Sequence, residues 1–235
     1  TPPTPSTLSP SDSVVILGAH LDSINRQNWT ENVQTGRAPG ADDDASGIAL
    51  QLELFRVLLS HLPPYTLTHT IEFHVYAGEE VGLFGSGEVA AAYCAAHLPV
   101  RAMMQLDQCA YQRDPANEVL AVFTDNTDSQ LTDLLLSLAR TYLPSVRVVT
   151  SNEDNRADSD FHSWTNNGYR AAYLAEGPVD DIVYGNSKHT PFDTLDRISL
   201  PHAVNIGKVA LAYLVELAEP LPADRHLSSA IIAQN

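Results

Sequence analysis

The sequence SVVILGA at residues 13–19 is a continuous apolar run with polar residues on either side. Such a run is typical of a β-strand that is buried on both faces of a sheet. Residues 70–77 alternate apolar and polar side chains and predict a second strand, and residues 44–61, between the two, carry apolar side chains at helical spacing. This succession predicts an α/β fold with a mostly parallel, mixed central sheet and helices on both of its faces.

The same alternation continues along the chain. We expect strands at 101–106, 119–123, 147–150 and 170–175, helices at 84–96, 130–142, 160–167 and 201–217, and a long loop at 176–199. One domain is therefore predicted over residues 13–219. Residues 1–12 are expected to be a proline-rich linker or a processed N-terminus, because the chain begins with Thr1 rather than methionine, and residues 220–235 a proline-broken tail.

The composition excludes several classes of protein. Thirteen basic and twenty-nine acidic side chains leave a formal charge of −16, which repels phosphate and excludes nucleic acid as a partner. The sequence has no apolar run of the roughly eighteen residues that cross a membrane. Two cysteines, Cys94 and Cys109, are too few for a disulfide scaffold, and we expect both to be unpaired. The acidity, the scarcity of lysine, the processed start and a glycosylation sequon at Asn28 favour a secreted, extracellular protein.

Polar side chains gather just past the carboxyl ends of the predicted strands, where open parallel sheets bind their ligands. His20 and Asp22 follow the first predicted strand, Glu79 and Glu80 follow the second, and Asp107 follows the third. Asp42–Asp44 precede the first helix, and His189 lies in the last loop. Imidazole nitrogens and carboxylate oxygens without thiolates are zinc-type ligands. Divalent ions would also relieve the repulsion among so many carboxylates.

Each of these segments also has a purely structural interpretation. His20 by itself suits a hydrogen-bonded histidine at a strand end, and Asp42–Asp44 suit the capping of a helix. Glu79 and Glu80 suit a solvated turn. Only the coincidence of these segments at one edge of the sheet favours a metal site.

Five motifs go further and resemble those of the two-zinc aminopeptidases, in particular the secreted bacterial and fungal leucine aminopeptidases. They occur in order over about residues 13–217 and read GAHLDS at 18–23, APGADDDASG at 38–47, AGEEVGL at 77–83, QLD at 105–107 and HTxxDT at 189–194. The resemblance implies the zinc-dependent exopeptidase fold, two Zn²⁺ per chain, and peptides with a free N-terminus as substrates.

The resemblance also implies a role for each matching residue. Asp43 would be the carboxylate shared by both metal ions. His20 and Asp107 would complete the first site, and Glu80 and His189 would complete the second. Glu79 would be the general base that moves a proton from water to the leaving amine. Asp22 would hold the second imidazole nitrogen of the histidine ligand two residues before it. A cis peptide bond would follow Asp43.

The chain departs from that family around the substrate pocket. Where its look-alikes carry Cys-Gly-Tyr-x-Cys-Ser-Asp, with the tyrosine at the oxyanion, residues 154–160 read DNRADSD, so that Arg156 stands in the place of the tyrosine. Arg156 would contact an oxyanion or a carboxylate, or else pair with neighbouring aspartates on the surface. Gln108 and Lys188, each next to an implied ligand, are also possible substrate contacts, and their polarity does not suit a pocket for leucine.

Three other functions compete with the aminopeptidase. A carboxypeptidase on the same fold would need a cationic clamp, for which Arg156 and Lys188 are the candidates. A single-zinc glutaminyl cyclase would not need all five ligand positions, which are intact here. A binding module without metal would need none of them.

The same resemblance raises an expectation about the N-terminus. The look-alikes carry a helical stretch and two strands ahead of the strand at 13–19, whereas here only a proline-rich dozen residues precede it. We therefore expect the chain to be the larger part of a cleaved enzyme, with a separate N-terminal fragment paired to a sheet edge that would otherwise stay open.

Overall fold

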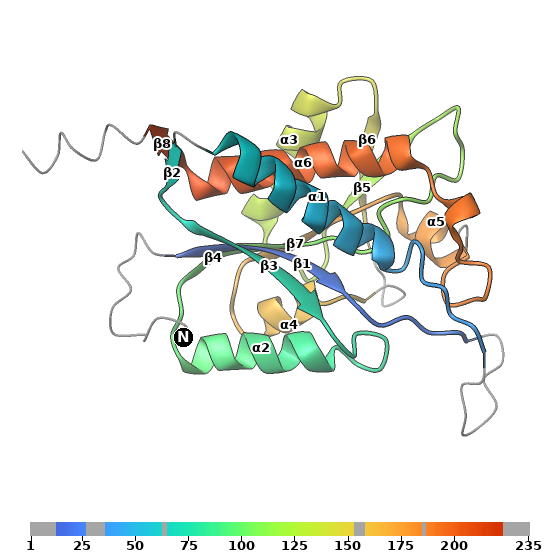
Figure 1. Ribbon diagram of the computed structural model, residues 1–235, viewed down its shortest axis with the longest axis horizontal. Coiled ribbons are helices and arrows are strands. Elements are labelled where there is room, and N and C mark those ends of the chain that lie inside the picture. Colours follow the sequence, from blue (N-terminus) through green and yellow to red (C-terminus); the bar gives the residue numbers. More distant parts are fainter. Residues whose placement is uncertain (1–12, 27–35, 63–64, 153–157, 185–186, 223–235) are drawn as a thin grey trace, which may run out of the picture.

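The computed structural model describes residues 13–26, 36–62, 65–152, 158–184 and 187–222 (Figure 1). Its centre is a six-stranded sheet in the order β3-β1-β4-β7-β5-β6. The strands are β1 (Val14–His20), β3 (Thr70–Tyr76), β4 (Val100–Gln105), β5 (Val119–Phe123), β6 (Arg147–Ser151) and β7 (Ala171–Ala175). Neighbouring strands are parallel, except that β5 and β7 are antiparallel. The predicted α/β fold with a mostly parallel, mixed sheet is confirmed.

Helices cover both faces of this sheet (Figure 1). On one face lie α1 (Ala45–His61), α3 (Ser129–Tyr142) and α6 (Leu200–Ala218), and on the other lie α2 (Phe84–Ala95) and α4 (Phe161–Asn166). No helix in the described part of the chain is long and apolar enough to cross a membrane.

Side chains of β1 alternate between two hydrophobic cores, one on each face of the sheet. Val15 and Leu17 belong to the core beneath α1, α3 and α6, whereas Ile16 belongs to the core that contains Trp164 of α4. All four side chains are fully buried. The interpretation of the apolar run as a strand buried on both faces is therefore confirmed.

Several short elements were not expected from the sequence. The antiparallel pair of β2 (Tyr65–Leu67) and β8 (Pro220–Pro222) extends the ordered elements three residues past the boundary expected at 219. The expected loop at 176–199 contains α5 (Val179–Tyr184) and a 3₁₀ turn at Leu195–Arg197. A strand of three residues is too short to show alternation, a helix of six is too short to show helical spacing, and the prolines of β8 argue against a strand. Residues 1–12, 223–235 and the sequon at Asn28 lie outside the described residues.

The start of α1 is held close to the end of β4. Asp44 caps the helix, since its carboxylate accepts a hydrogen bond from the main-chain N–H of Gly47 at 3.1 Å. A Cβ at Gly47 would lie 2.5 Å from Asp44 Oδ1 and 2.6 Å from the carbonyl oxygen of Leu106, so only glycine allows this approach. A cis peptide bond joins Asp43 and Asp44, as the resemblance implies. The packing thereby sets the aspartates before α1 against the carboxyl ends of β1 and β4.

Both cysteines are free, as expected: Cys94 is exposed on α2 and Cys109 is buried beyond β4.

Candidate metal centre

Three buried side chains form a first cluster at the carboxyl ends of β1 and β4. His20 Nε2 lies 3.0 Å from Asp43 Oδ1 and 3.6 Å from Asp107 Oδ1. One potential ligand atom from each residue lies within 4.8 Å of the others, a spacing that suits a single cation.

A second cluster shares Asp43 with the first. His189 Nε2 lies 3.0 Å from Asp43 Oδ2 and 2.8 Å from Glu80 Oε2. Because Oδ1 of Asp43 faces His20 and Oδ2 faces His189, one carboxylate connects two adjacent cation sites. The structure thus brings together the five residues that the resemblance names as ligands, from five separate segments of the chain.

The polar atoms of these clusters fit metal ions better than they fit one another. Glu80 Oε1 and Asp107 Oδ1 are buried without a hydrogen-bond partner, which is costly for a carboxylate. Imidazole and carboxylate donors without sulfur form the ligand set that zinc accepts. A cation in each cluster would satisfy both orphaned oxygens.

In the metal-free clusters the two imidazoles hold their protons more strongly than a free imidazole does. Burial opposes the charge of His20, but the carboxylates of Asp107 and Asp43 outweigh it and raise the pKa of this imidazole. Burial likewise opposes the charge of His189, and Asp43 and Glu80 raise its pKa. Burial raises the pKa of Asp43, but the two histidines and Lys188 outweigh burial and hold this pKa well below the usual range. Metal binding must therefore displace protons from the imidazoles.

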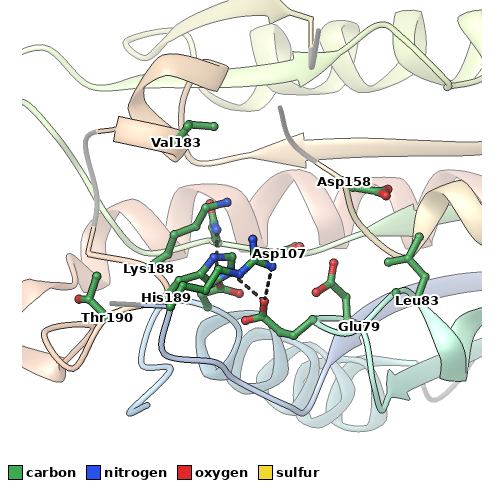
Figure 2. A pocket seen from close by; sticks show the side chains of 13 residues that line it. Glu79, Leu83, Asp107, Asp158, Val183, Lys188, His189 and Thr190 are labelled. Atoms are coloured by element: carbon green, nitrogen blue, oxygen red, sulfur yellow. Dashed lines mark hydrogen bonds and ion pairs between the residues drawn. The ribbon is translucent and has the colours of Figure 1, made fainter. Parts of the chain in front are cut away.

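Glu79 lines the same cavity but belongs to neither cluster. Figure 2 shows Lys188 and His189 on one wall of the cavity, Leu83 and Asp158 on the other, and Glu79 between them. Burial, and after it the charge of Asp107, raises the pKa of Glu79 to about 10. A carboxyl group that holds a proton beside two cation sites is suited to proton transfer.

Asp22 contacts the second nitrogen of the His20 imidazole through its main chain rather than through its carboxylate. The Nδ1–H of His20 donates a 2.9 Å hydrogen bond to the main-chain carbonyl of Asp22, whereas the nearest carboxylate oxygen of Asp22 is 4.0 Å away. The carboxylate instead accepts from the main-chain N–H groups of Gly78, Glu79 and Glu80 at 2.8, 3.1 and 3.1 Å. The carbonyl group of Asp22 therefore occupies Nδ1 of His20 and leaves Nε2 available to a metal. The side chain of Asp22 positions the two glutamates.

Three residues support the site in ways that sequence reasoning did not predict. Asp193 accepts from the main-chain N–H groups of Asp42 and Asp43 at 2.9 and 3.1 Å, and thereby positions the shared carboxylate. Asp44 Oδ2 accepts from the N–H of His20 at 3.0 Å, and Ser159 donates to Asp107 Oδ2 at 2.6 Å. Asp193 stands in the quoted HTxxDT motif and Ser159 in the loop at 154–160, but neither position by itself reveals what it contacts.

The cavity over the clusters has a volume of about 600 Å³, and both polar and apolar side chains line it. Of the possible substrate contacts, Gln108 and Lys188 line it, and Gln108 Nε2 donates to Asp43 Oδ2 at 3.4 Å. Arg156 lies outside the described residues. Arg26 also lines the cavity, although no sequence pattern singled it out.

The sequence profile of peptidase family M28 matches residues 4–214. The chain belongs to this family. Leucine aminopeptidase 1 of Arthroderma otae is 35% identical over 215 residues, which are 89% of this chain and 56% of that protein. The crystal structure of the LapA aminopeptidase of Legionella pneumophila has 34% sequence identity and a TM-score of 0.78, over 88% of this chain and 52% of that one. The chain thus spans about half the length of these relatives.

The family fold also serves a different reaction. A glutaminyl cyclase of Porphyromonas gingivalis has a TM-score of 0.71 over 87% of this chain and 73% of that one, with 18% sequence identity. At this identity the likeness concerns the fold alone, so the site has to distinguish the two reactions.

Proposed function

We propose that this protein is a zinc-dependent aminopeptidase that holds two Zn²⁺ and hydrolyses the N-terminal peptide bond of peptides. The observation that carries the proposal is the pair of clusters that share Asp43, with Glu79 beside both and bound to neither. His20, Asp43 and Asp107 would hold one ion, and Asp43, Glu80 and His189 the other.

Two zinc ions in these positions would supply an acidified water and a Lewis acid for the scissile carbonyl. The chain itself supplies the proton transfer. Glu79 accepts a proton from water and returns it to the departing amine. Its pKa of about 10 in the metal-free protein would fall beside two dications, because their charge favours the carboxylate. The main-chain bonds from Gly78, Glu79 and Glu80 to Asp22 fix the turn from which it acts.

The competing functions have weaker support. A single-metal cyclase has no use for a second cluster with its own histidine, and His189 and Glu80 provide one. A binding module has no use for orphaned buried carboxylate oxygens. A carboxypeptidase depends on a clamp at Arg156 or Lys188, and Lys188 is the one in the described cavity wall.

A screen of aminoacyl chromogenic substrates, with and without chelator, tests the proposal. We expect cleavage of unblocked substrates, no cleavage of N-acetylated ones, and loss of activity with chelator that zinc restores. Elemental analysis should give two zinc ions per chain. Activity in a protein that carries no more than one metal ion would contradict the two-metal mechanism.

We further propose that an N-terminal fragment of the same precursor covers the edge of the sheet. Among the described strands, β3 pairs with β1 alone. Beside that edge Leu52, Phe55 and Val75 are about half or more exposed and border an apolar groove of about 440 Å³. An open apolar edge invites aggregation unless another chain segment covers it. A fully active 25.5 kDa species without a companion peptide in native mass spectrometry would contradict this proposal.

A secreted, extracellular location is part of the same proposal. The charge of −16 and the sequon at Asn28 support it. Fractionation of the producing cells, with the protein found only inside them, would contradict it.

A further inference from the structure

Two cationic side chains flank His189 on the wall of the catalytic cavity. The main-chain N–H of Arg26 donates to the carbonyl oxygen of His189 at 2.8 Å, and Lys188 directly precedes His189 in the chain. Both side chains line the cavity, and Figure 2 shows Lys188 along the wall beside His189. The chain has thirteen basic side chains against twenty-nine acidic ones, and two of the thirteen line this cavity.

The guanidinium of Arg26 is close to the reacting centre. Its Nη2 lies 3.5 Å from Glu80 Oε2, while the side chain remains 51% exposed. In the proposed function Glu80 binds a metal ion. That ion would neutralise the partner of Arg26 and repel the guanidinium, which leaves Arg26 available to another anion in the cavity.

Lys188 acts electrostatically on the shared ligand. Its charge contributes to the low pKa of Asp43, where burial acts in the opposite direction and the hydrogen bonds from His189 and His20 contribute more. With two dications present, their charge would exceed that of the ligand carboxylates of Asp43, Glu80 and Asp107. The carboxylates of Glu79 and Asp158 also line the cavity, and Figure 2 shows Asp158 on the wall opposite Lys188 and His189 and Glu79 between the two walls. The positive charge is therefore concentrated on the wall beside His189.

Such a wall discriminates between substrate side chains. An apolar side chain would displace water from the two cations without offering them a hydrogen bond in return, which costs free energy. A carboxylate would replace the lost hydration with charge-assisted hydrogen bonds. We propose that Arg26 and Lys188 are specificity-determining residues that select substrates with a carboxylate next to the scissile bond. The inference rests on the proposed function.

The carboxylate has two possible sources, which isosteric substrates distinguish. The first is the side chain of the N-terminal residue, tested with glutamyl and glutaminyl p-nitroanilide. The second is the residue after the scissile bond, tested with the dipeptides Ala-Glu and Ala-Gln as C-terminal amides. We expect kcat/KM to favour the acid in at least one pair by about tenfold, the size of one charge-assisted hydrogen bond. The preference should shrink at high salt.

Lys188→Met and Arg26→Met keep the length of the apolar stem and remove the charge. Where a cation contacts the acidic residue of a substrate pair, the variant that lacks this cation should no longer prefer the acid of that pair. Lys208→Met is the matched control, because Lys208 lies on α6 with its Nζ bonded to Asn205 and should leave the preference unchanged. Equal kcat/KM within both pairs, or a preference that survives both variants, would overturn the inference.

A binding measurement separates this inference from the proposed function. If the zinc-loaded protein cleaves none of the substrates, the aminopeptidase proposal fails, and titration calorimetry with free glutamate and glutamine still tests the wall. Tighter binding of glutamate, lost in Lys188→Met or Arg26→Met, supports the inference, and equal binding overturns it.

Discussion

Asp22 and Glu80 are 58 residues apart in sequence, yet Asp22 Oδ2 accepts a 3.1 Å hydrogen bond from the main-chain N–H of Glu80. The other carboxylate oxygen accepts from the two preceding N–H groups, at Gly78 and Glu79. One side chain after β1 therefore holds the whole turn after β3 that carries the proposed general base and a proposed ligand. The two strands are adjacent and parallel, which is why their carboxyl ends meet here.

Removal of this carboxylate should loosen the turn. We expect Asp22→Ala to lower the free energy of unfolding by about 2 kcal/mol, because three N–H groups lose a charged acceptor that is only partly exposed to solvent. Asp22→Asn should cost less, since its amide oxygen still accepts. Denaturant titration of the metal-free protein measures both, with Asp133→Ala, exposed on α3, as control. Unchanged stability in Asp22→Ala would show that the turn holds itself.

The two adjacent glutamates should fail in different ways when changed. Glu79→Gln keeps the volume but cannot accept a proton, so kcat should fall by about a hundredfold or more while KM and zinc content barely change. Glu80→Gln removes a charged ligand, so zinc affinity should fall and part of the lost rate should return at high zinc. Loss of metal in the Glu79 variant and retention in the Glu80 variant would reverse the assigned roles.

Zinc affinity should depend steeply on pH. In the metal-free protein the carboxylates of both clusters raise the pKa of His20 and of His189 despite burial, so both imidazoles keep their protons above the pH at which a free imidazole loses its own. Zinc must displace these protons. For each proton displaced, the zinc affinity should therefore fall about tenfold for every unit by which the pH is lowered. Calorimetry in buffers of different ionisation enthalpy should detect the release of about two protons. Binding without proton release would contradict the protonated state.

Asp160 should make the metal-free protein less stable as pH rises. Burial raises the pKa of Asp160 to about 7, although Gln105 Nε2 donates to it at 3.1 Å. The folded state then holds a proton that the unfolded chain has lost, so stability contributed below the unfolded pKa of about 4 disappears as pH rises through about 7. Asp160→Asn imitates the protonated form.

We expect the Asp160→Asn variant to gain about 2 kcal/mol over the parent protein between about pH 5 and about pH 8. Thermal and denaturant unfolding of the metal-free proteins at both pH values measures this gain. Asp133→Asn, at an exposed position, serves as control. The same difference from the parent at both pH values would show that Asp160 does not titrate in this range.

Much of the fold is predictable because it depends on local pattern. The apolar run before His20 and the alternation over residues 70–76 predict buried strands. Parallel strands bring their carboxyl ends to one edge, so the sequence also predicts that His20, Glu80 and Asp107 gather there. The strands β2 and β8 were missed because three residues are too few to show alternation, and α5 because six residues are too few to show helical spacing.

The sequence by itself determined which side chains we propose as carriers of the chemistry, since strand periodicity and motif order depend only on neighbours along the chain. Only the tertiary structure decided how they are held and flanked. Asp193 reaches the N–H groups of Asp42 and Asp43 across 151 and 150 residues, and Arg26 reaches Glu80 from the segment after β1. These contacts depend on the path that the loops take over the sheet edge, and no local pattern encodes that path.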